Sequence, residues 1–324
     1  MARFLLHCFL LAAPVLGMVH WLNAQIKVDY AWAMDYCQLS YFNENHDKYE
    51  VVLFGSSHFG RQLSPVIFDS IQGRTSNSSF LFAFDQLYAP LNLTLLENLT
   101  NDDSFRPSKI LFELAPVEPL KESKNLESTR VKSWYTLDDA RFYFNSSWEA
   151  ASVPSSIYYG FNHLRASFGF LFSGGIFWEK MATSFMVCGE VVNEPLLLEG
   201  RSTESEGSDE LIALHDEANQ SDSVAEVPVT DPYVSRLNRL AQQLKVRGTC
   251  FVLVIPPRLG PDEIYYLRGV GNAVSGAHFV DLSSALKYPQ FYRSEWVFDN
   301  DHLNSLAVPA FTAELAKAAR SCNN

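Results

Sequence analysis

Short, uninterrupted apolar runs and helical patterns alternate over two stretches of the chain. The first run, Val51–Phe54, ends at Gly55, and such a run is typical of a strand buried on both faces of a parallel sheet. Five segments are expected as strands on this ground: 51–54, 80–84, 109–114, 250–255 and 278–282. Six are expected as helices: 28–45, 65–71, 89–99, 232–246, 261–270 and 305–320. This alternation predicts an α/β domain in which helices cover both faces of a parallel sheet.

The pattern lapses between residues 116 and 230. Aromatic-rich segments at 134–144 and 156–186 are expected as helices. Residues 199–231 hold ten acidic residues and one arginine, a composition typical of a solvated or disordered loop to which we assign no chemistry. We therefore expect 26–115 and 232–324 to form two halves of one domain, separated by an insertion at 116–231. The insertion forms either a cap beside an active site or a decoration, and both interpretations are open.

The N-terminus carries a long apolar run. Arg3 precedes nineteen residues, Phe4–Leu22, without a single Asp, Glu, Lys or Arg, near the length that a helix needs to cross a bilayer. An uncleaved signal anchor, a cleaved signal peptide and a buried core helix are the three interpretations. The run exceeds the usual secretory apolar core of about 7–15 residues. We expect residues 1–25 to be an uncleaved transmembrane anchor, with Arg3 in the cytoplasm and the rest exported.

Composition and charge narrow the class of protein. The chain is 324 residues long, 47% hydrophobic and 19% charged, which is typical of a globular protein with a full core. Its net charge of −12 repels nucleic-acid phosphates, so we expect no nucleic-acid partner. Four cysteines lie beyond the N-terminal run, and disulfides and free thiols are both open for them: Cys37, Cys188, Cys250 and Cys322.

The first candidate for chemistry is a serine that follows the first expected strand. Ser57 comes directly after Gly55 and Ser56, at the carboxyl end of a strand, where open α/β sheets bind their ligands. A helix beginning there offers free backbone N–H groups to a developing oxyanion. Two interpretations remain: Ser57 is a nucleophile, or Ser56 and Ser57 merely cap the next helix.

The second candidate is an acidic turn that carries a histidine. Asp299 precedes His302 by three residues, so its carboxylate can reach Nδ1 of the imidazole and leave Nε2 free to accept a serine proton. An exposed histidine in a helix-capping cluster is one alternative. A metal site built from Asp299, Asp301 and His302 is another, but no second histidine cluster completes it. We expect neither a metal nor a cofactor.

Together the two segments resemble the SGNH/GDSL hydrolase superfamily. Gly55-Ser56-Ser57 matches its Gly-Asp-Ser block, with Ser56 in the place of the aspartate, and Asp299 and His302 match its Asp-x-x-His block. The form of both blocks, with Arg61, Pro65 and the run 310–312, looks like a membrane-anchored branch. That branch modifies cell-wall and polysaccharide acyl groups, as in D-alanylation and alginate O-acetylation. The resemblance covers residues 49–115 and 232–320.

The resemblance implies a fold and a reaction. The fold would be a flavodoxin-like three-layer α/β/α sandwich. Ser57 would attack an acyl ester, His302 would act as base and then acid, and Asp299 would orient His302. The substrate would be an acylated carbohydrate or other cell-envelope polymer of a bacterium, in the periplasm or outside the cell. Hydrolysis and acyl transfer are both open, and a membrane-bound acyltransferase is a further implied partner.

The middle of the domain departs from the family pattern. The superfamily supplies oxyanion donors from a glycine after the second strand and an asparagine after the third. This chain has Ala-Phe-Asp-Gln at 83–86 and Glu-Leu-Ala-Pro at 113–116. We name a backbone N–H near Asp85 or the Gln86 amide as a substitute donor, and Arg61 as a group that binds a substrate anion or forms a surface ion pair. The rival interpretation is therefore a catalytically inactive module that binds a carbohydrate or a membrane acyltransferase.

Overall fold

The computed structural model describes residues 33–75, 77–117 and 222–320, together with isolated positions at 14, 136, 138, 139, 141 and 142. The chain divides into two compact units, Met1–Gln38 with Pro119–Val191, and Leu39–Glu118 with Val192–Asn324. Apart from isolated positions, the expected anchor at 1–25 and the expected helices at 134–144 and 156–186 lie outside the described residues. Within the described part of the chain, no helix is long and apolar enough to span a membrane. The description below concerns the second unit.

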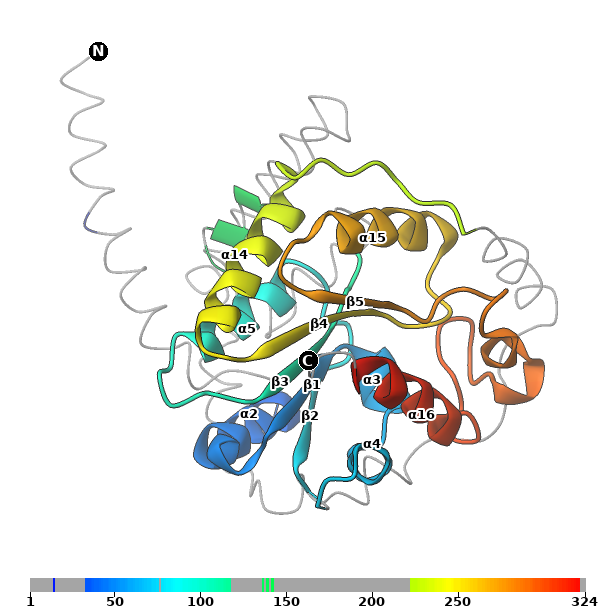
Figure 1. Ribbon diagram of the computed structural model, residues 1–324, viewed down its shortest axis with the longest axis horizontal. Coiled ribbons are helices and arrows are strands. Elements are labelled where there is room, and N and C mark those ends of the chain that lie inside the picture. Colours follow the sequence, from blue (N-terminus) through cyan, green and yellow to red (C-terminus); the bar gives the residue numbers. More distant parts are fainter. Residues whose placement is uncertain are drawn as a thin grey trace, which may run out of the picture. The chain divides into compact units, whose positions relative to one another are not determined.

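Five parallel strands form one sheet in the order β2-β1-β3-β4-β5 (Figure 1). They are β1 (Val51–Gly55), β2 (Ser79–Ala83), β3 (Lys109–Glu113), β4 (Cys250–Ile255) and β5 (His278–Asp281). Each begins and ends within one residue of the segment expected from the apolar runs. Lys109 of β3 aligns with Val51 on one side and with Cys250 on the other, so β3 and β4 join the two halves at the centre of the sheet. The expectation of a parallel sheet is confirmed.

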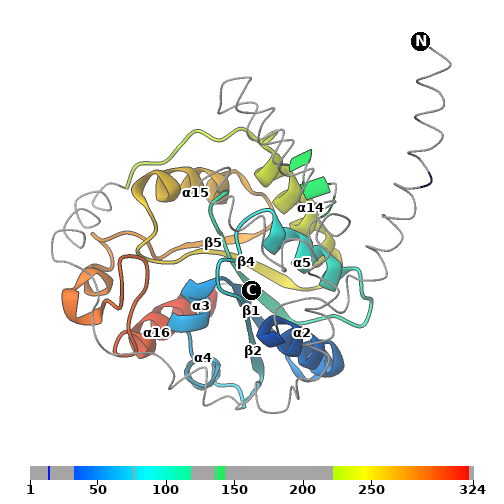
Figure 2. The same cartoon turned by 180° about the vertical axis from the view of Figure 1, so that it is seen from behind.

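One face of the sheet is covered by α3 (Ser57–Gln62), α4 (Pro65–Gln72) and α16 (Val308–Ala318) (Figure 1; Figure 2). Alternate strand residues point to this face and meet buried side chains of the three helices. The core here includes Leu53, Leu81, Leu111, Val252, Phe59, Phe68, Phe311 and Leu315. Burying an aliphatic or aromatic side chain of this kind stabilises the fold by about 1.5–3 kcal/mol. This packing joins the two helices that follow β1 to α16, near the C-terminal end of the described residues.

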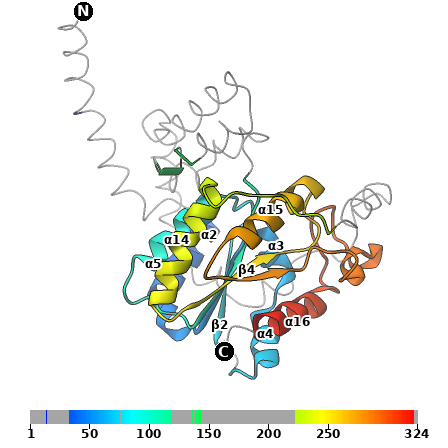
Figure 3. The ribbon, with the colours of Figure 1, turned by 45° about the horizontal axis from the view of Figure 1, so that its top comes forward.

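The opposite face carries α2 (Ala33–Asn45), α5 (Leu91–Thr100), α14 (Pro232–Val246) and α15 (Pro261–Ala273) (Figure 1; Figure 3). A row of rings crosses four adjacent strands there, from Phe82 through Phe54 and Phe112 to Phe251, with centroids 5.1, 5.5 and 5.8 Å apart. Phe42 of α2 lies 5.1 Å from Phe82. Helices thus flank both faces of the all-parallel sheet, an arrangement consistent with a three-layer α/β fold.

The connections contain three short 3₁₀ helices, η1 (His46–Lys48), η3 (Pro289–Tyr292) and η4 (Ser294–Trp296). The last helix begins at Val308 rather than at the expected 305. The reason is a turn over 304–307, in which Asn304 Oδ1 accepts the N–H of Leu306 at 3.0 Å. Cys250, the first residue of β4, is disulfide-bonded, which decides between the two interpretations open for this cysteine.

The tail of the acidic segment is exposed but attached to the domain. Asp222 accepts a hydrogen bond from Ser284 Oγ at 2.8 Å and forms ion pairs with Arg268 and Lys287. Ala225 donates its N–H to Tyr265 of α15 at 3.1 Å. Residues 222–230 are thus a mostly exposed loop, as expected, and polar contacts hold it against the domain.

The strand order contains a topological switch point between β1 and β3. Because β1 lies between β2 and β3, the connections that leave β1 and β3 run in opposite directions at the carboxyl edge. Ligands of open α/β sheets bind at such a switch point. Ser56 and Ser57 follow β1, and Glu113 ends β3, so polar residues meet at this switch point.

Candidate active site

The segment after β1 separates the roles of two adjacent serines. Ser56 is the N-cap of α3, and its Oγ accepts the N–H of His58 at 3.3 Å. Ser57 is the first residue of the helix, and its Oγ points instead to His302. The capping interpretation therefore holds for Ser56, whose hydroxyl satisfies an otherwise free N–H group. Ser57 is left available for chemistry.

Gly55 makes room for a neighbouring carboxylate. Its φ lies outside the left-handed region, so the tight turn expected from sequence does not require glycine for its backbone angles. A Cβ at this position would instead collide with the carboxylate of Glu113 and the ring of Phe59. The missing side chain lets Glu113 approach the loop that carries Ser57.

The histidine lies on a small hairpin-like loop. Val297 and Leu303 form an antiparallel bridge, and Phe298 donates its N–H to the carbonyl of His302 at 2.9 Å. Asn304 closes the base of the loop, where its Nδ2 donates to the carbonyl of Glu295 at 2.8 Å. These contacts hold the imidazole at the carboxyl edge of the sheet, facing the start of α3.

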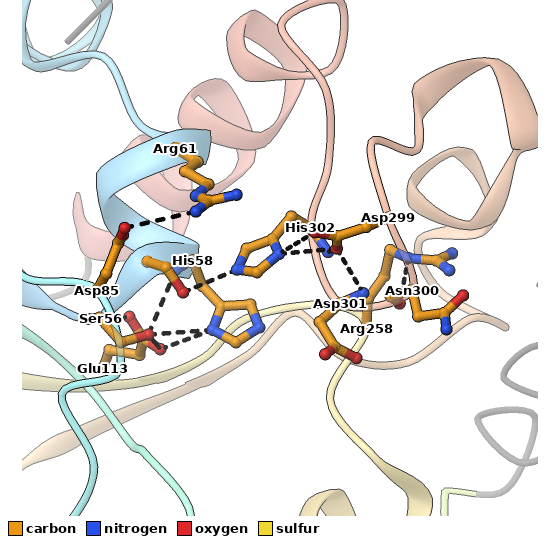
Figure 4. A network of polar contacts seen from close by, with 11 residues as sticks. Ser56, His58, Arg61, Asp85, Glu113, Arg258, Asp299, Asn300, Asp301 and His302 are labelled. Atoms are coloured by element: carbon orange, nitrogen blue, oxygen red, sulfur yellow. Dashed lines mark hydrogen bonds and ion pairs between the residues drawn. The ribbon is translucent and has the colours of Figure 1, made fainter. Parts of the chain in front are cut away.

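Ser57, His302 and Asp299 form a continuous chain of contacts, of which Figure 4 shows the pair His302 and Asp299. Ser57 Oγ lies 2.7 Å from Nε2 of His302, and Nδ1 of His302 lies 2.7 and 2.9 Å from the two carboxylate oxygens of Asp299. Because a carboxylate accepts, Nδ1 carries the proton and Nε2 accepts from the serine hydroxyl. The structure thus brings Ser57 to the pair Asp299 and His302, although Ser57 and His302 are 245 positions apart along the chain.

Asp299 is held in its ionised form. Partial burial alone raises its pKa, but the hydrogen bond and the charge of His302 outweigh burial. The backbone N–H groups of Asp301 and His302 also donate to Asp299 Oδ1, at 2.9 and 2.8 Å. Together they lower the pKa of Asp299 to about 2. The carboxylate can therefore orient His302 and stabilise a positive charge on it.

A second histidine lies under the triad. His58 Nδ1 is 3.1 Å from Glu113 Oε1, and the His58 ring stacks on that of His302 with centroids 5.0 Å apart. Burial lowers the pKa of His58, but the hydrogen bond and charge of Glu113 more than compensate, so the net shift is upward. The sequence analysis gives neither residue a role, because Glu113 is far from His58 in sequence and the contact arises only from the adjacency of β1 and β3.

Arg258 supports the histidine loop from the end of β4. Its side chain is fully buried, and its Nε donates to the carbonyl of Asn300 at 3.1 Å (Figure 4). Its backbone has φ 69°, a left-handed conformation that is uncommon outside glycine. In the sequence Arg258 follows Pro256 and Pro257, and this position does not predict its contact with Asn300.

Arg61 and Gln86, the two residues expected from sequence to contact the substrate, differ in their surroundings. Arg61, one helical turn after Ser57, has its guanidinium 3.4 Å from Asp85 and 5.8 Å from the centre of the Phe298 ring. Gln86 is exposed with φ 58°, and among the described residues no hydrogen bond joins its side chain to the triad. The structure therefore leaves Arg61 beside the site and gives no contact that makes Gln86 an oxyanion donor. The described residues also contain no cluster of three or more His, Cys, Asp or Glu arranged to hold a metal.

Comparison with models of known protein families and with curated proteins finds no match for this chain. The chemistry of the site is therefore argued from its geometry. The arrangement provides an activated hydroxyl, a base oriented by a carboxylate and a buried second histidine, at the edge of a parallel sheet where ligands bind.

Proposed function

We propose that Ser57, His302 and Asp299 are the catalytic triad of a serine esterase or O-acyltransferase. The observation that carries the proposal is the pair of 2.7 Å contacts that His302 makes, one with Ser57 Oγ and one with Asp299. A nucleophile, a base and an orienting carboxylate in this order are the parts that acyl transfer requires.

The reaction proceeds in two halves. Ser57 Oγ attacks the ester carbonyl while Nε2 of His302 takes the serine proton, and the collapse of the tetrahedral intermediate passes that proton to the departing alcohol. The acyl group is then an ester of Ser57. Water or an acceptor hydroxyl attacks it, gives its proton to His302, and restores the Ser57 hydroxyl as the product leaves. Asp299 keeps His302 oriented in both halves.

We assign the domain to an SGNH-like, flavodoxin-like fold that acts on an acylated extracytoplasmic glycan or cell-envelope polymer. The support is the resemblance of residues 55–57 and 299–302 to the superfamily blocks, and the strand order with its switch point at β1 and β3. An exported, membrane-anchored location is supported by the apolar run Phe4–Leu22 and by the disulfide of Cys250, because disulfides persist in oxidising compartments.

A fluorophosphonate probe tests the proposal directly. The full-length protein in detergent should be labelled, and peptide mapping should place the adduct on Ser57 and not on Ser56. Ser57→Ala should abolish labelling, whereas Ser70→Ala, an exposed serine on α4, should leave it unchanged. Absence of labelling in the wild type, together with no turnover of short acyl esters, would refute the proposed activity.

A second candidate function is a non-catalytic binding module. The observation in its favour is the exposed position of Gln86, without a hydrogen bond to the triad among the described residues. Loss of one oxyanion donor costs a factor of about 10²–10³ in rate. Two measurements separate the functions: turnover of short acyl esters, and binding of a glycan or a membrane acyltransferase. A non-catalytic module would turn over no ester, and it would bind equally well with Ser57 and with Ala at that position.

A further inference from the structure

A buried polar cluster of Ser56, His58 and Glu113 lies beside the triad (Figure 4). Glu113 is 1% exposed and accepts three hydrogen bonds: from the N–H of Ser56 at 2.7 Å, from Ser56 Oγ at 2.5 Å and from His58 Nδ1 at 3.1 Å. Each bond reaches the loop that carries the nucleophile. One carboxylate from β3 therefore fixes the residues on both sides of Ser57.

The charge of this cluster must be balanced inside the protein. A buried carboxylate without a counter-charge is strongly destabilising. Among the groups that hydrogen-bond to Glu113, His58 is the one that can carry a positive charge. The acidic groups facing His58 from other elements are Asp301 of the histidine loop and Glu263 of α15, while His302 stacks on its ring and Arg258 lies beside the same loop. This acidic surrounding favours the imidazolium form of His58.

The orientation of His58 depends on one side of its ring. Nδ1 contacts Glu113 and Ser56 Oγ, both at 3.1 Å, while Nε2 is buried and makes no hydrogen bond within the described part of the chain. The residue is 8% exposed, and its ring is inclined by 28° to that of His302. Glu113 thus holds the His58 ring in place against the ring of His302, the general base of the triad.

Resting on the proposed function, we propose that His58 and Glu113 are positioning residues of the triad. The protonated His58 ring, held by Glu113, supports the His302 imidazole at the distance that Ser57 requires. The site should therefore lose activity when His58 gives up its proton.

The direction of the pH dependence follows from the ion pair. Because Glu113 raises the pKa of His58, the pair contributes fully below the ordinary histidine pKa and is lost as the pH rises through the raised value. A triad alone gives an activity that rises with pH to a plateau as its base loses a proton. The additional group predicts a second, alkaline limb in kcat/KM.

The test compares His58→Asn and Glu113→Gln with wild type over an acidic-to-alkaline pH series on a short acyl ester. Asparagine keeps a donor near the position of Nδ1 but has neither the charge nor the ring. We expect kcat to fall about tenfold to a hundredfold, because small misplacements of catalytic groups cost this much, with little change in KM. The alkaline limb should disappear in His58→Asn, which removes the titrating ring, and should move to lower pH in Glu113→Gln, which removes the charge that raises the pKa of His58. His278→Asn, an exposed histidine at the start of β5, should match wild type.

Persistence of the alkaline limb in His58→Asn, or a wild-type kcat in that variant, would overturn the inference. A wild type that neither turns over esters nor reacts with the probe would refute the proposed function instead. The inference is then decided by NMR of the histidine ring protons. The His302 signals should shift as His58 titrates in wild type and not in His58→Asn, and no such shift would refute the positioning role.

Discussion

Arg258 and Asn300 connect the end of β4 to the turn that carries His302: Arg258 Nε donates to the Asn300 carbonyl at 3.1 Å. Arg258 also stacks over the ring of Tyr292, at 5.8 Å. The neighbours of Asn300 on either side, Asp299 and Asp301, share the turn with His302. A fully buried side chain from the loop after β4 thus fixes the geometry of the base and its orienting carboxylate.

Replacing Arg258 should therefore loosen the triad. We expect Arg258→Gln to lower kcat on a short acyl ester about tenfold or more, and to lower Tm, because the Asn300 carbonyl loses a buried donor worth about 1–3 kcal/mol. Arg247→Gln is the matched control, since Arg247 also donates to a main-chain carbonyl, that of Asp102, away from the site. Equal kcat in both variants would contradict this role.

The triad residues should act as one unit. Ser57→Ala and His302→Ala should each abolish most esterase activity, and the double variant should be little worse than either, because residues of a triad are strongly non-additive. Asp299→Asn should be severe but milder, since it disturbs the tautomer of His302 and spares the nucleophile. Independent, additive losses in a double-mutant cycle would argue against a triad.

Gly55 should tolerate no side chain. A Cβ there meets the Glu113 carboxylate and the Phe59 ring, so Gly55→Ala should reduce the free energy of unfolding by about 1–3 kcal/mol, as overpacking does. Gly60→Ala is the control, because its Cβ would lie 3.5 Å from Ala83, an ordinary contact, and alanine favours a helix. Urea denaturation of both variants measures the difference, and equal stabilities would contradict the crowding at Gly55.

Asp299 should contribute to stability in an acid-sensitive way. Its pKa is lowered from 3.8 to about 2, so its stabilising contribution is present above 3.8 and is lost as the pH falls through about 2. The difference in unfolding free energy between wild type and Asp299→Asn should be constant at neutral pH and shrink over this acid window. A difference that stays constant throughout would show that His302 does not stabilise the ionised carboxylate.

The acidic segment should be removable up to Asp222, the first of its residues that the structure describes. Replacing 202–221 with a short Gly/Ser linker should shift Tm by no more than about a few degrees, because such a composition buries little apolar surface. Extending the replacement through Val227 should cost more, since it removes the ion pairs of Asp222 and the contact of Ala225 and Val227 with Gly269. Calorimetry of the two deletions gives the comparison.

The sheet was largely predictable from the sequence because its strands are buried on both faces. A strand such as β4 appears as an unbroken apolar run, and all five runs became strands of a parallel sheet. The contact among Ser57, His302 and Asp299 was also expected, since strand ends and their turns meet at one edge. Their catalytic role remains a prediction.

The supporting residues were not predictable in the same way. Glu113 reads as the last residue of a strand, and its partnership with His58 depends on β1 and β3 being neighbours. Arg258 is a single cation after two prolines, and its contact with Asn300 depends on the path of a long loop. Such pairings arise from topology rather than from local spacing, so no periodicity in the sequence predicts them.

The central pairing of β3 with β4 has a consequence for proteolysis. The nucleophile belongs to the polypeptide before the insertion and its base to the polypeptide after it, while the ladder from Lys109 to Glu113 and Cys250 to Val254 joins the two non-covalently. A single cut between residues 143 and 221 would leave a nicked heterodimer that still holds both. An active-site label would then migrate with the N-terminal fragment alone on a denaturing gel run after reduction of the Cys250 disulfide, although both fragments elute together under native conditions.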